Sequence, residues 1–174
     1  MHLIIDGYNL IRQVHDLARY ERESMERARE VLIEKLALYR KIKRHKVTVV
    51  FDGVLNMSES PSTYKQAGVA VCFSSDVEKA DDVIKRMVNQ QTQAVTVVTS
   101  DRDILNHAEK QGAATIYSPQ FYERLSLAVM MGMDAKPDDD DEEVTHKRWT
   151  TKKRGPSKRL PKKKRQNKNR LKKL

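Results

Sequence analysis

The feature that most constrains the fold is a series of short apolar runs, rich in β-branched residues, separated by segments with helical periodicity. The five runs are residues 3–5, 47–51, 69–73, 94–99 and 113–117. Strands that are buried on both faces read as continuous apolar runs of this kind. Because strands that alternate with helices favour a parallel sheet covered by helices, the sequence predicts a three-layer α/β domain.

Four helices are expected between and after these runs, each behind a residue suited to cap its first turn. The predicted starts are Ser24, Ser75, Ser100 and Ser118, and Gly112 is expected to end the third helix. Glu78 lies three residues after Ser75 and completes a capping box for a helix that reaches about Asn89. The segment 53–68 has no clear periodicity and is predicted to be a loop.

Charge is distributed unevenly along the chain. The sequence holds 34 Lys and Arg against 24 Asp and Glu, a net charge of +10. Residues 144–174 contain 15 of the basic residues and no acidic one, which leaves residues 1–143 with a net charge of −5. Six consecutive acidic residues, 138–143, precede the basic run. We therefore expect one folded domain over residues 1–133, then an acidic linker and a disordered basic tail over residues 134–174.

Several classes of protein are excluded. No apolar run approaches the roughly 20 residues that cross a bilayer, and no basic segment followed by a long apolar stretch begins the chain. The one cysteine, Cys72, lies in an apolar run and is expected to be a buried thiol, without a disulfide partner. We expect a cytoplasmic protein without membrane contact. A homo-oligomer is compatible with the sequence but is not indicated by it.

Acidic residues follow the ends of three predicted strands. Asp6, Asp52 and Asp101 are expected at the carboxyl edge of the sheet, where α/β proteins bind ligands. Further acidic residues accompany them at Asp81, Asp82 and Asp103. Carboxylates within about 4–6 Å raise one another's pKa, so their convergence favours a divalent cation. Mg²⁺ or Mn²⁺ would suit these oxygen ligands and would generate hydroxide for attack at phosphorus.

A purely structural explanation is open for part of this set. The helix dipole favours acidic residues in a first helical turn without any metal, which would explain the acidic residues near the two helix starts. Asp6 is different, because it ends an apolar run at the start of the chain and precedes Gly7-Tyr8-Asn9. A carboxylate has little capping value there, and it favours the interpretation as a metal site.

Four short motifs resemble those of the YacP-like group of NYN domains, a branch of the PIN-like nucleases. The motifs are Leu3-Ile4-Ile5-Asp6-Gly7-Tyr8-Asn9-Leu10, Val49-Val50-Phe51-Asp52-Gly53, Ala80-Asp81-Asp82-Val83-Ile84 and Val97-Val98-Thr99-Ser100-Asp101. The first is the most specific, and all four occur in the family order over most of residues 1–130. The resemblance implies a PIN-like fold with a parallel sheet of about five strands in the order 3-2-1-4-5.

The resemblance also implies a metal-dependent endoribonuclease, in which a water activated by Mg²⁺ or Mn²⁺ attacks the phosphodiester in line and leaves a 5′-phosphate and a 3′-hydroxyl. The implied metal ligands and catalytic residues are Asp6, Asp81 and Asp101, with Asn9 holding a metal-bound water or a phosphate. The implied residues of second rank are Asp52, Asp82 and Asp103. One departure from the pattern is Lys79, which stands where many PIN-like nucleases carry an acidic residue.

Basic side chains are expected to bind RNA through its phosphates. On the body, Arg12 and Arg102 lie near the expected active edge. In the tail, the candidate residues are Lys147, Arg148, Trp149, Lys152, Lys153, Arg154, Lys162, Lys163, Lys164 and Arg165. Trp149 could stack on an unpaired base. RNA is therefore the expected partner, and the ribosome is a candidate for a second.

Three other functions stay open. A non-catalytic RNA-binding or ribosome-associated factor fits the tail equally well, and it would keep its RNA affinity after the carboxylates are neutralised. A haloacid-type phosphatase would need an aspartate where this chain has Tyr8. DNA cleavage of the flap-endonuclease kind is disfavoured by Lys79 and by the lack of a recognisable arch or duplex clamp.

Overall fold

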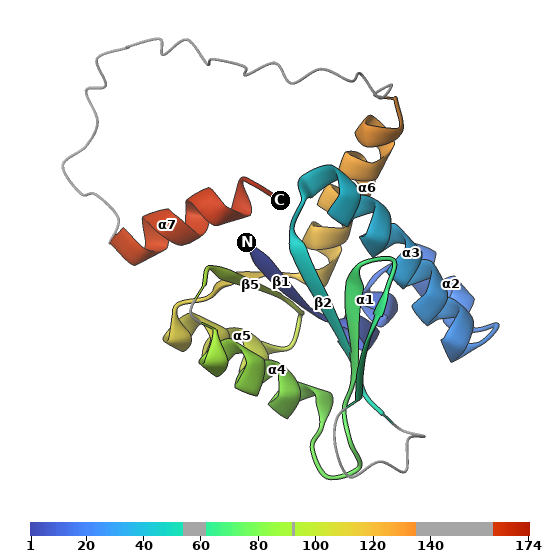
Figure 1. Cartoon of the computed structure of the whole chain (residues 1–174), viewed down its shortest axis with the longest axis horizontal. Coiled ribbons are helices and arrows are strands. Elements are labelled where there is room, and N and C mark those ends of the chain that lie inside the picture. Colours follow the sequence, from blue (N-terminus) through green and yellow to red (C-terminus); the bar gives the residue numbers. More distant parts are fainter. Residues whose placement is uncertain (54–61, 92, 135–161) are drawn as a thin grey trace.

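The computed structural model describes residues 1–53, 62–91, 93–134 and 162–174, and these residues form a six-stranded sheet with helices on both faces (Figure 1). The strands are β1 (His2–Asp6), β2 (Lys46–Phe51), β3 (Ser62–Gln66), β4 (Val69–Phe73), β5 (Val95–Val98) and β6 (Ala114–Ile116). Their order is β3-β4-β2-β1-β5-β6, and every pair is parallel except β3 with β4. The α/β class and the order of the five predicted strands are confirmed.

The helices form the two outer layers of the domain. They are α1 (Gly7–Gln13), α2 (His15–Glu21), α3 (Met25–Lys43), α4 (Ala80–Gln90), α5 (Arg102–Gln111), α6 (Ser118–Asp134) and α7 (Lys162–Leu171). α1, α2, α3 and α6 lie on one face of the sheet, while α4 and α5 lie on the other (Figure 1). Within the described ranges, none of these helices is both long and apolar enough to cross a membrane.

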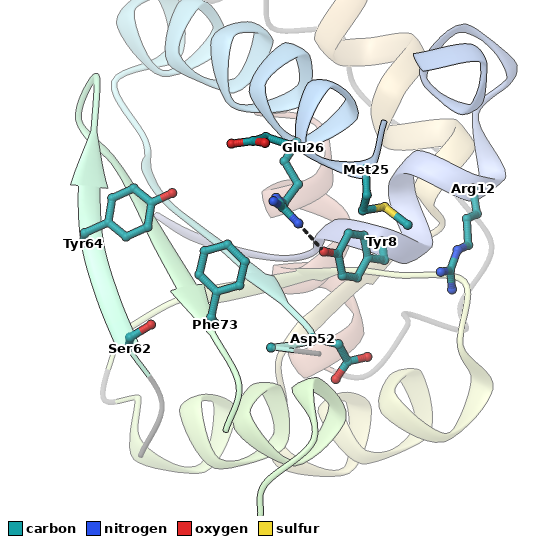
Figure 2. Close-up of a pocket in the computed structure, with 10 residues that line it drawn as sticks. Tyr8, Arg12, Met25, Glu26, Asp52, Ser62, Tyr64 and Phe73 are labelled. Carbon is teal, nitrogen blue, oxygen red and sulfur yellow. Dashed lines mark hydrogen bonds between the residues drawn. The ribbon is translucent and has the colours of Figure 1, made fainter. Parts of the chain in front are cut away.

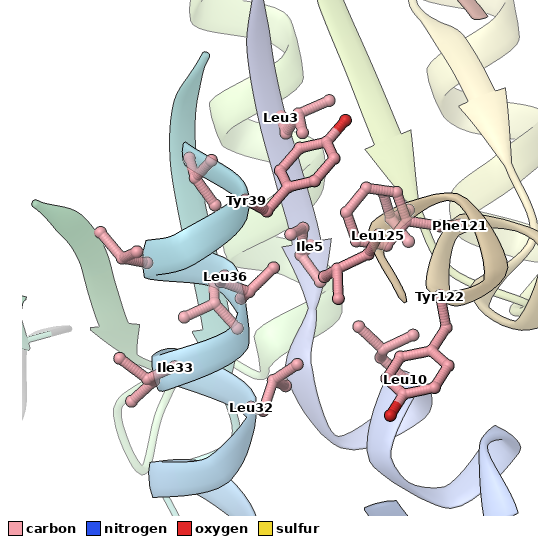
Figure 3. Close-up of a cluster of buried hydrophobic side chains, with 14 of the residues drawn as sticks. Leu3, Ile5, Leu10, Leu32, Ile33, Leu36, Tyr39, Phe121, Tyr122 and Leu125 are labelled. Carbon is pink, nitrogen blue, oxygen red and sulfur yellow. The ribbon is translucent and has the colours of Figure 1, made fainter. Parts of the chain in front are cut away.

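Side-chain alternation along the central strands creates a core on each face of the sheet. Leu3 and Ile5 of β1 pack under α3 and α6, where Tyr39 and Phe121 meet edge to face at 5.6 Å (Figure 3). Ile4 points the other way, into the core beneath α4 and α5. Cys72 belongs to this second core and is 1% exposed, which confirms the prediction of a buried thiol.

The segment 53–68 is the clearest error of the sequence-based prediction of the fold. Part of it is not a loop, because Ser62–Gln66 forms the edge strand β3, antiparallel to β4. Ala67 and Gly68 both adopt positive φ angles, 48° and 82°, as in the tight turns that join hairpin strands. All five residues of β3 are exposed, so the strand has no apolar alternation by which to recognise it.

The helix boundaries were predicted with mixed success. Ser24 caps α3 as expected, with its hydroxyl accepting from the amide of Arg27, and Gly112 ends α5 in the left-handed conformation. The helix expected from Ser75 begins only at Ala80, because the Ser75 hydroxyl accepts from Glu78 N–H in a separate turn.

Two further starts are shifted by one residue. The N-cap of α5 is Asp101 rather than the predicted Ser100. Ser118 is the first residue of α6 rather than its cap, and its hydroxyl donates to the side chain of Asn9 on α1. α1 and α2 were not predicted from the sequence.

The described end of the basic tail is not disordered, in contrast to the prediction. Residues 162–171 form α7, and Leu174 is 6% exposed in the core with its backbone oxygen accepting from the Tyr39 hydroxyl at 3.1 Å. Asn167 donates to the backbone oxygen of Ala113 at 3.0 Å, and Arg124 donates to that of Leu171. A lone basic helix is unfavourable, but tertiary packing and hydrogen bonds supply what its sequence lacks. The proposed domain boundary after residue 133 stays a prediction.

We expect the double variant Leu171→Ala/Leu174→Ala to lower the free energy of unfolding by roughly 2–3 kcal/mol, because it removes apolar contacts that hold α7 on the body. Denaturant titration followed by circular dichroism would measure the change. The control Lys172→Ala/Lys173→Ala alters two exposed side chains in the same segment. Equal stability of the two variants would show that the end of the chain does not contribute to the core.

Candidate active site

Asp6 is a buried carboxylate at the carboxyl end of the central strand β1, with only 9% of the residue exposed. One of its oxygens accepts from the Thr99 hydroxyl at 2.9 Å, and the other accepts from the backbone N–H of Asn9 at 3.2 Å. Thr99 follows β5, so its contact ties the carboxylate to the neighbouring strand, while the contact with Asn9 makes Asp6 the N-cap of α1. The expectation that a carboxylate has little capping value at this position is therefore wrong. The same Thr99 oxygen accepts from the N–H of Asp101 at 3.1 Å, which links the two aspartates.

The environment of Asp6 disfavours its charged form. The pKa of Asp6 is raised to about 6, chiefly by burial and to a smaller extent by the negative charges of Asp81 and Asp52. The hydrogen bonds from Asn9 and Thr99 oppose this rise without cancelling it. A carboxylate with a raised pKa at the ligand-binding edge of an α/β sheet is a candidate functional group.

Asp81 and Asp101 stand beside this group, in the first turn of α4 and at the N-cap of α5. Burial raises the pKa of Asp81, the charge of Asp101 is the next largest cause, and Lys85 opposes the rise. Asp101 accepts from the N–H groups of Asp103 and Ile104, so it also caps its helix. The structure therefore brings Asp6, Asp81 and Asp101 into one electrostatically coupled cluster.

The remaining predicted acidic residues have structural partners or lie in solvent. Asp52 accepts from the Ala80 N–H at 2.9 Å and from the Ser74 hydroxyl at 3.3 Å, and thereby caps α4 from a different strand. This remote cap replaces the one that Lys79, the N-cap residue, does not supply. Asp103 lies in the first turn of α5, where the helix dipole favours an acidic residue, and it also forms an ion pair with Lys85, while Asp82 is exposed.

Asn9 joins three of the strand–helix junctions. Its side-chain oxygen accepts from the backbone N–H of Ser100 and from the hydroxyl of Ser118, both at 2.8 Å. Asn9 lies on α1 after β1, Ser100 precedes α5, and Ser118 opens α6. One amide therefore holds together the loops that carry the Asp6 and Asp101 carboxylates.

We expect Asn9→Ala to lower the free energy of unfolding by about 2 kcal/mol, because it leaves the donors of Ser100 and Ser118 without their acceptor. Thermal unfolding would measure the loss. Asn106→Ala is the matched control, since Asn106 is exposed on α5. A loss of the same size in both variants would argue against the special role of the Asn9 amide.

The donor set fits a divalent cation. Aspartate oxygens are hard ligands, and none of the ion pairs within the described ranges involves Asp6, Asp81 or Asp101. In that same part of the chain, no group of three or more His, Cys, Asp or Glu side chains is already arranged around one metal position. Mg²⁺ often takes only one or two carboxylates and completes its shell with waters and substrate phosphates, so the cluster suits a hydrated ion.

With this geometry in view, comparison with known proteins decides the family. The family model described as the YacP-like NYN domain matches residues 3–173. The chain belongs to the YacP-like NYN domain family. The match extends beyond the four sequence motifs and includes α7, so the basic tail is part of the region that the family shares.

Three matches of this NYN domain, one to a sequence and two to solved structures, are to YacP of Bacillus subtilis. The uncharacterized protein YacP of strain 168 is 34% identical over 104 residues, which cover 57% of this chain and 59% of that protein. The crystal structure of Rae1 (YacP) is 28% identical, with a TM-score of 0.64 over 76% of this chain and 78% of that chain. A mutant of Rae1 has a TM-score of 0.63 at the same identity, over 75% and 77% of the two chains. The NYN domain thus has the PIN-like nuclease fold.

The residues predicted to bind RNA are dispersed over the NYN domain. Arg12 lies in the last turn of α1 and pairs with Glu21 at 3.1 Å, while Arg102 is the exposed first residue of α5. Arg165 is exposed on α7, which contacts Gly112 and Ala113 at the amino end of β6 and therefore lies away from Asp6. Lys147, Arg148, Trp149, Lys152, Lys153 and Arg154 lie outside the described residues, as do the side chains of Lys162, Lys163 and Lys164.

Sequence analysis missed two components of the site. Thr99 is not among the predicted site residues, although it immediately precedes Ser100-Asp101 in the fourth motif. A pocket of about 930 Å³ beside Asp52 was also missed, and Tyr8, Tyr64 and Phe73 contribute its aromatic rings (Figure 2). Tyr8 lies on α1, far in the sequence from the β3–β4 hairpin that carries Tyr64 and Phe73, so no local motif could reveal the pocket.

We expect the free energy of unfolding of Asp6→Asn, relative to that of the wild type, to rise by about 1 kcal/mol between pH 5 and pH 7.5 in EDTA. The folded-state pKa of Asp6 is raised, so ionising this carboxylate costs stability as the pH rises through about 6, and asparagine avoids that cost. Thermal melts of both proteins across this range would measure the difference. A pH-independent difference would contradict the raised pKa, and exposed Glu34→Gln serves as the control.

Proposed function

We propose that this YacP-like NYN domain is a metal-dependent endoribonuclease that hydrolyses RNA phosphodiester bonds. The observation that supports the proposal best is the coupled cluster of Asp6, Asp81 and Asp101 at the carboxyl edge of a PIN-like sheet. Bringing unpaired carboxylates together costs stability, and a bound cation offsets that cost. The cluster is difficult to explain in a protein that only binds RNA.

In this proposal Asp6, Asp81 and Asp101 hold Mg²⁺ or Mn²⁺. The cation, when bound, supplies Lewis acidity that lowers the pKa of a water and offsets charge on the phosphate. Asn9 already uses its amide oxygen to hold Ser100 and Ser118, so its amide nitrogen is the group left to donate to a phosphate oxygen or a water. Asp52 keeps the first turn of α4, and with it Asp81, beside Asp6.

The basic residues of the tail support RNA as the substrate and leave the ribosome as a candidate partner. Their affinity for phosphates is independent of sequence and sensitive to salt. A non-catalytic RNA-binding factor remains the second candidate, because 15 basic residues in positions 144–174 would serve it equally well. The two functions differ in what neutralising the carboxylates does to cleavage and to binding.

We expect Asp81→Asn and Asp101→Asn each to reduce cleavage of end-labelled single-stranded RNA at least about 100-fold in Mg²⁺ or Mn²⁺, because each removes a proposed ligand. EDTA should abolish cleavage by the wild type, and Glu34→Gln should cleave normally. Gel analysis of the fragments would also distinguish internal cuts from trimming at the ends. Circular dichroism would show that the variants remain folded.

The substrate and the partner are tested in the same assay. DNA of matched sequence should not be cut, and ribosomes carrying mRNA provide the second substrate if naked RNA is inert. RNA binding that survives in both aspartate variants, with no cleavage of either substrate by the wild type, would contradict the nuclease proposal and favour the binding factor.

A further inference from the structure

The aromatic pocket beside Asp52 has no role in the proposed hydrolysis. It lies between α1, α3 and the β3–β4 hairpin, and its volume is about 930 Å³ (Figure 2). Asp52 belongs to its lining, and its carboxylate accepts at 2.9 Å from the N–H of Ala80, the residue that precedes Asp81. The pocket is therefore directly adjacent to the carboxylate cluster.

Aromatic rings form a continuous row across the pocket. Tyr64 and Phe73 are nearly parallel, with an interplanar angle of 16° and centroids 6.3 Å apart. Phe73 stacks on the buried Phe51 at 5.6 Å, and Phe51 meets Tyr8 at 5.1 Å. Tyr64 is 47% exposed and projects from the exposed strand β3, so its ring is available to a ligand.

Two arginines complete the walls of the pocket. The Arg29 guanidinium lies 5.5 Å from the centre of the Phe73 ring and donates to the Tyr8 hydroxyl at 2.8 Å. The Arg12 guanidinium lies 5.6 Å from the centre of the Tyr8 ring and pairs with Glu21. Both cations are thus held against aromatic rings, where they shape the pocket.

The lining favours a planar, neutral ligand over a phosphate. Both arginines have partners within the protein, and the carboxylates of Glu26 and Asp52 would repel an anion. Aromatic rings and guanidinium planes are the surfaces on which unpaired nucleobases stack. Glu26 and Ser62 add acceptors that could bind the amino group of a base.

We propose that this pocket, lined by Tyr8, Phe73, Tyr64 and Arg29, binds one unpaired nucleobase of the RNA next to the phosphodiester that is cut. The inference rests on the proposed nuclease function for its substrate. A base can enter the pocket only when it is unstacked from its neighbours in the strand. The pocket would therefore select single-stranded RNA and fix the position of the cut.

Abasic RNA tests the pocket directly. In a single-stranded RNA with a mapped cleavage site, each nucleotide near the site is replaced in turn by an abasic one. We expect one position at which the abasic substitution slows cleavage by the wild type about 5- to 100-fold, the effect of losing one stacked base. Tyr64→Ala should cleave the intact RNA more slowly and should lose its sensitivity at that position.

Tyr117→Ala is the matched control, because Tyr117 is 49% exposed and lies on the other side of the site, after β6. Cleavage by this variant should be slowed by the abasic substitution as much as cleavage by the wild type, and we call this slowing the abasic penalty. The inference is wrong if Tyr64→Ala retains the full penalty, or if Tyr64→Ala and Tyr117→Ala lose it equally.

A binding measurement separates this inference from the nuclease proposal. The probe is 2-aminopurine, placed at the sensitive position of the RNA, or at each position in turn if no RNA is cut. In EDTA, its fluorescence should fall when it stacks in the pocket of the wild type. The fluorescence should not fall with Tyr64→Ala. Quenching that depends on Tyr64 without any cleavage would support the base pocket and contradict the nuclease. Cleavage without an abasic penalty or Tyr64-dependent quenching would support the nuclease and overturn the pocket.

Discussion

The hydrogen bonds accepted by the Asn9 side chain are the contacts on which the carboxyl edge of the sheet depends. Loops that follow β1, β5 and β6 meet at one amide oxygen, which accepts from Ser100 and Ser118. Without this shared acceptor, Ser100 and Ser118 would have to satisfy their donors separately, and the link through Thr99 would lose the support of a second contact between the Asp6 and Asp101 segments. The Asn of the first sequence motif is therefore first a structural residue, whatever it donates to a substrate.

The same edge is built at the expense of stability. Asp6 is buried and has a raised pKa, and the pKa of Asp81 is raised by burial and by the charge of Asp101. Hydrogen bonds from Asn9 and Thr99 favour the charged form of Asp6 and oppose the effect of burial. In the proposed nuclease, the electrostatic cost of positioning the carboxylates is met when the protein folds and is not incurred again when a cation binds.

The sequence predicted the parts of this protein that depend on local patterns. The parallel strands were found because burial on both faces leaves apolar runs, and the positions of Asp6 and Asp101 follow from strand ends. β3 was not predicted because its five residues are exposed, and α7 was not predicted because its stability comes from contacts with Arg124 and Ala113. The remote cap from Asp52 to Ala80 likewise joins residues 28 positions apart.

Gly7 shows how closely the base pocket is tied to the core. A β-carbon at Gly7 would lie 2.2 Å from the ring of Phe51, and that ring contacts both Tyr8 and Phe73. Any side chain at position 7 would thus displace the floor of the pocket and the strand end that carries Asp6. Tyr64 stands outside this packed unit, on the exposed edge strand. Substitutions at Tyr64 can therefore alter substrate preference without repacking the core. The rings of Tyr8 and Phe73 both contact that of Phe51, so a change in one of the three requires changes in the others.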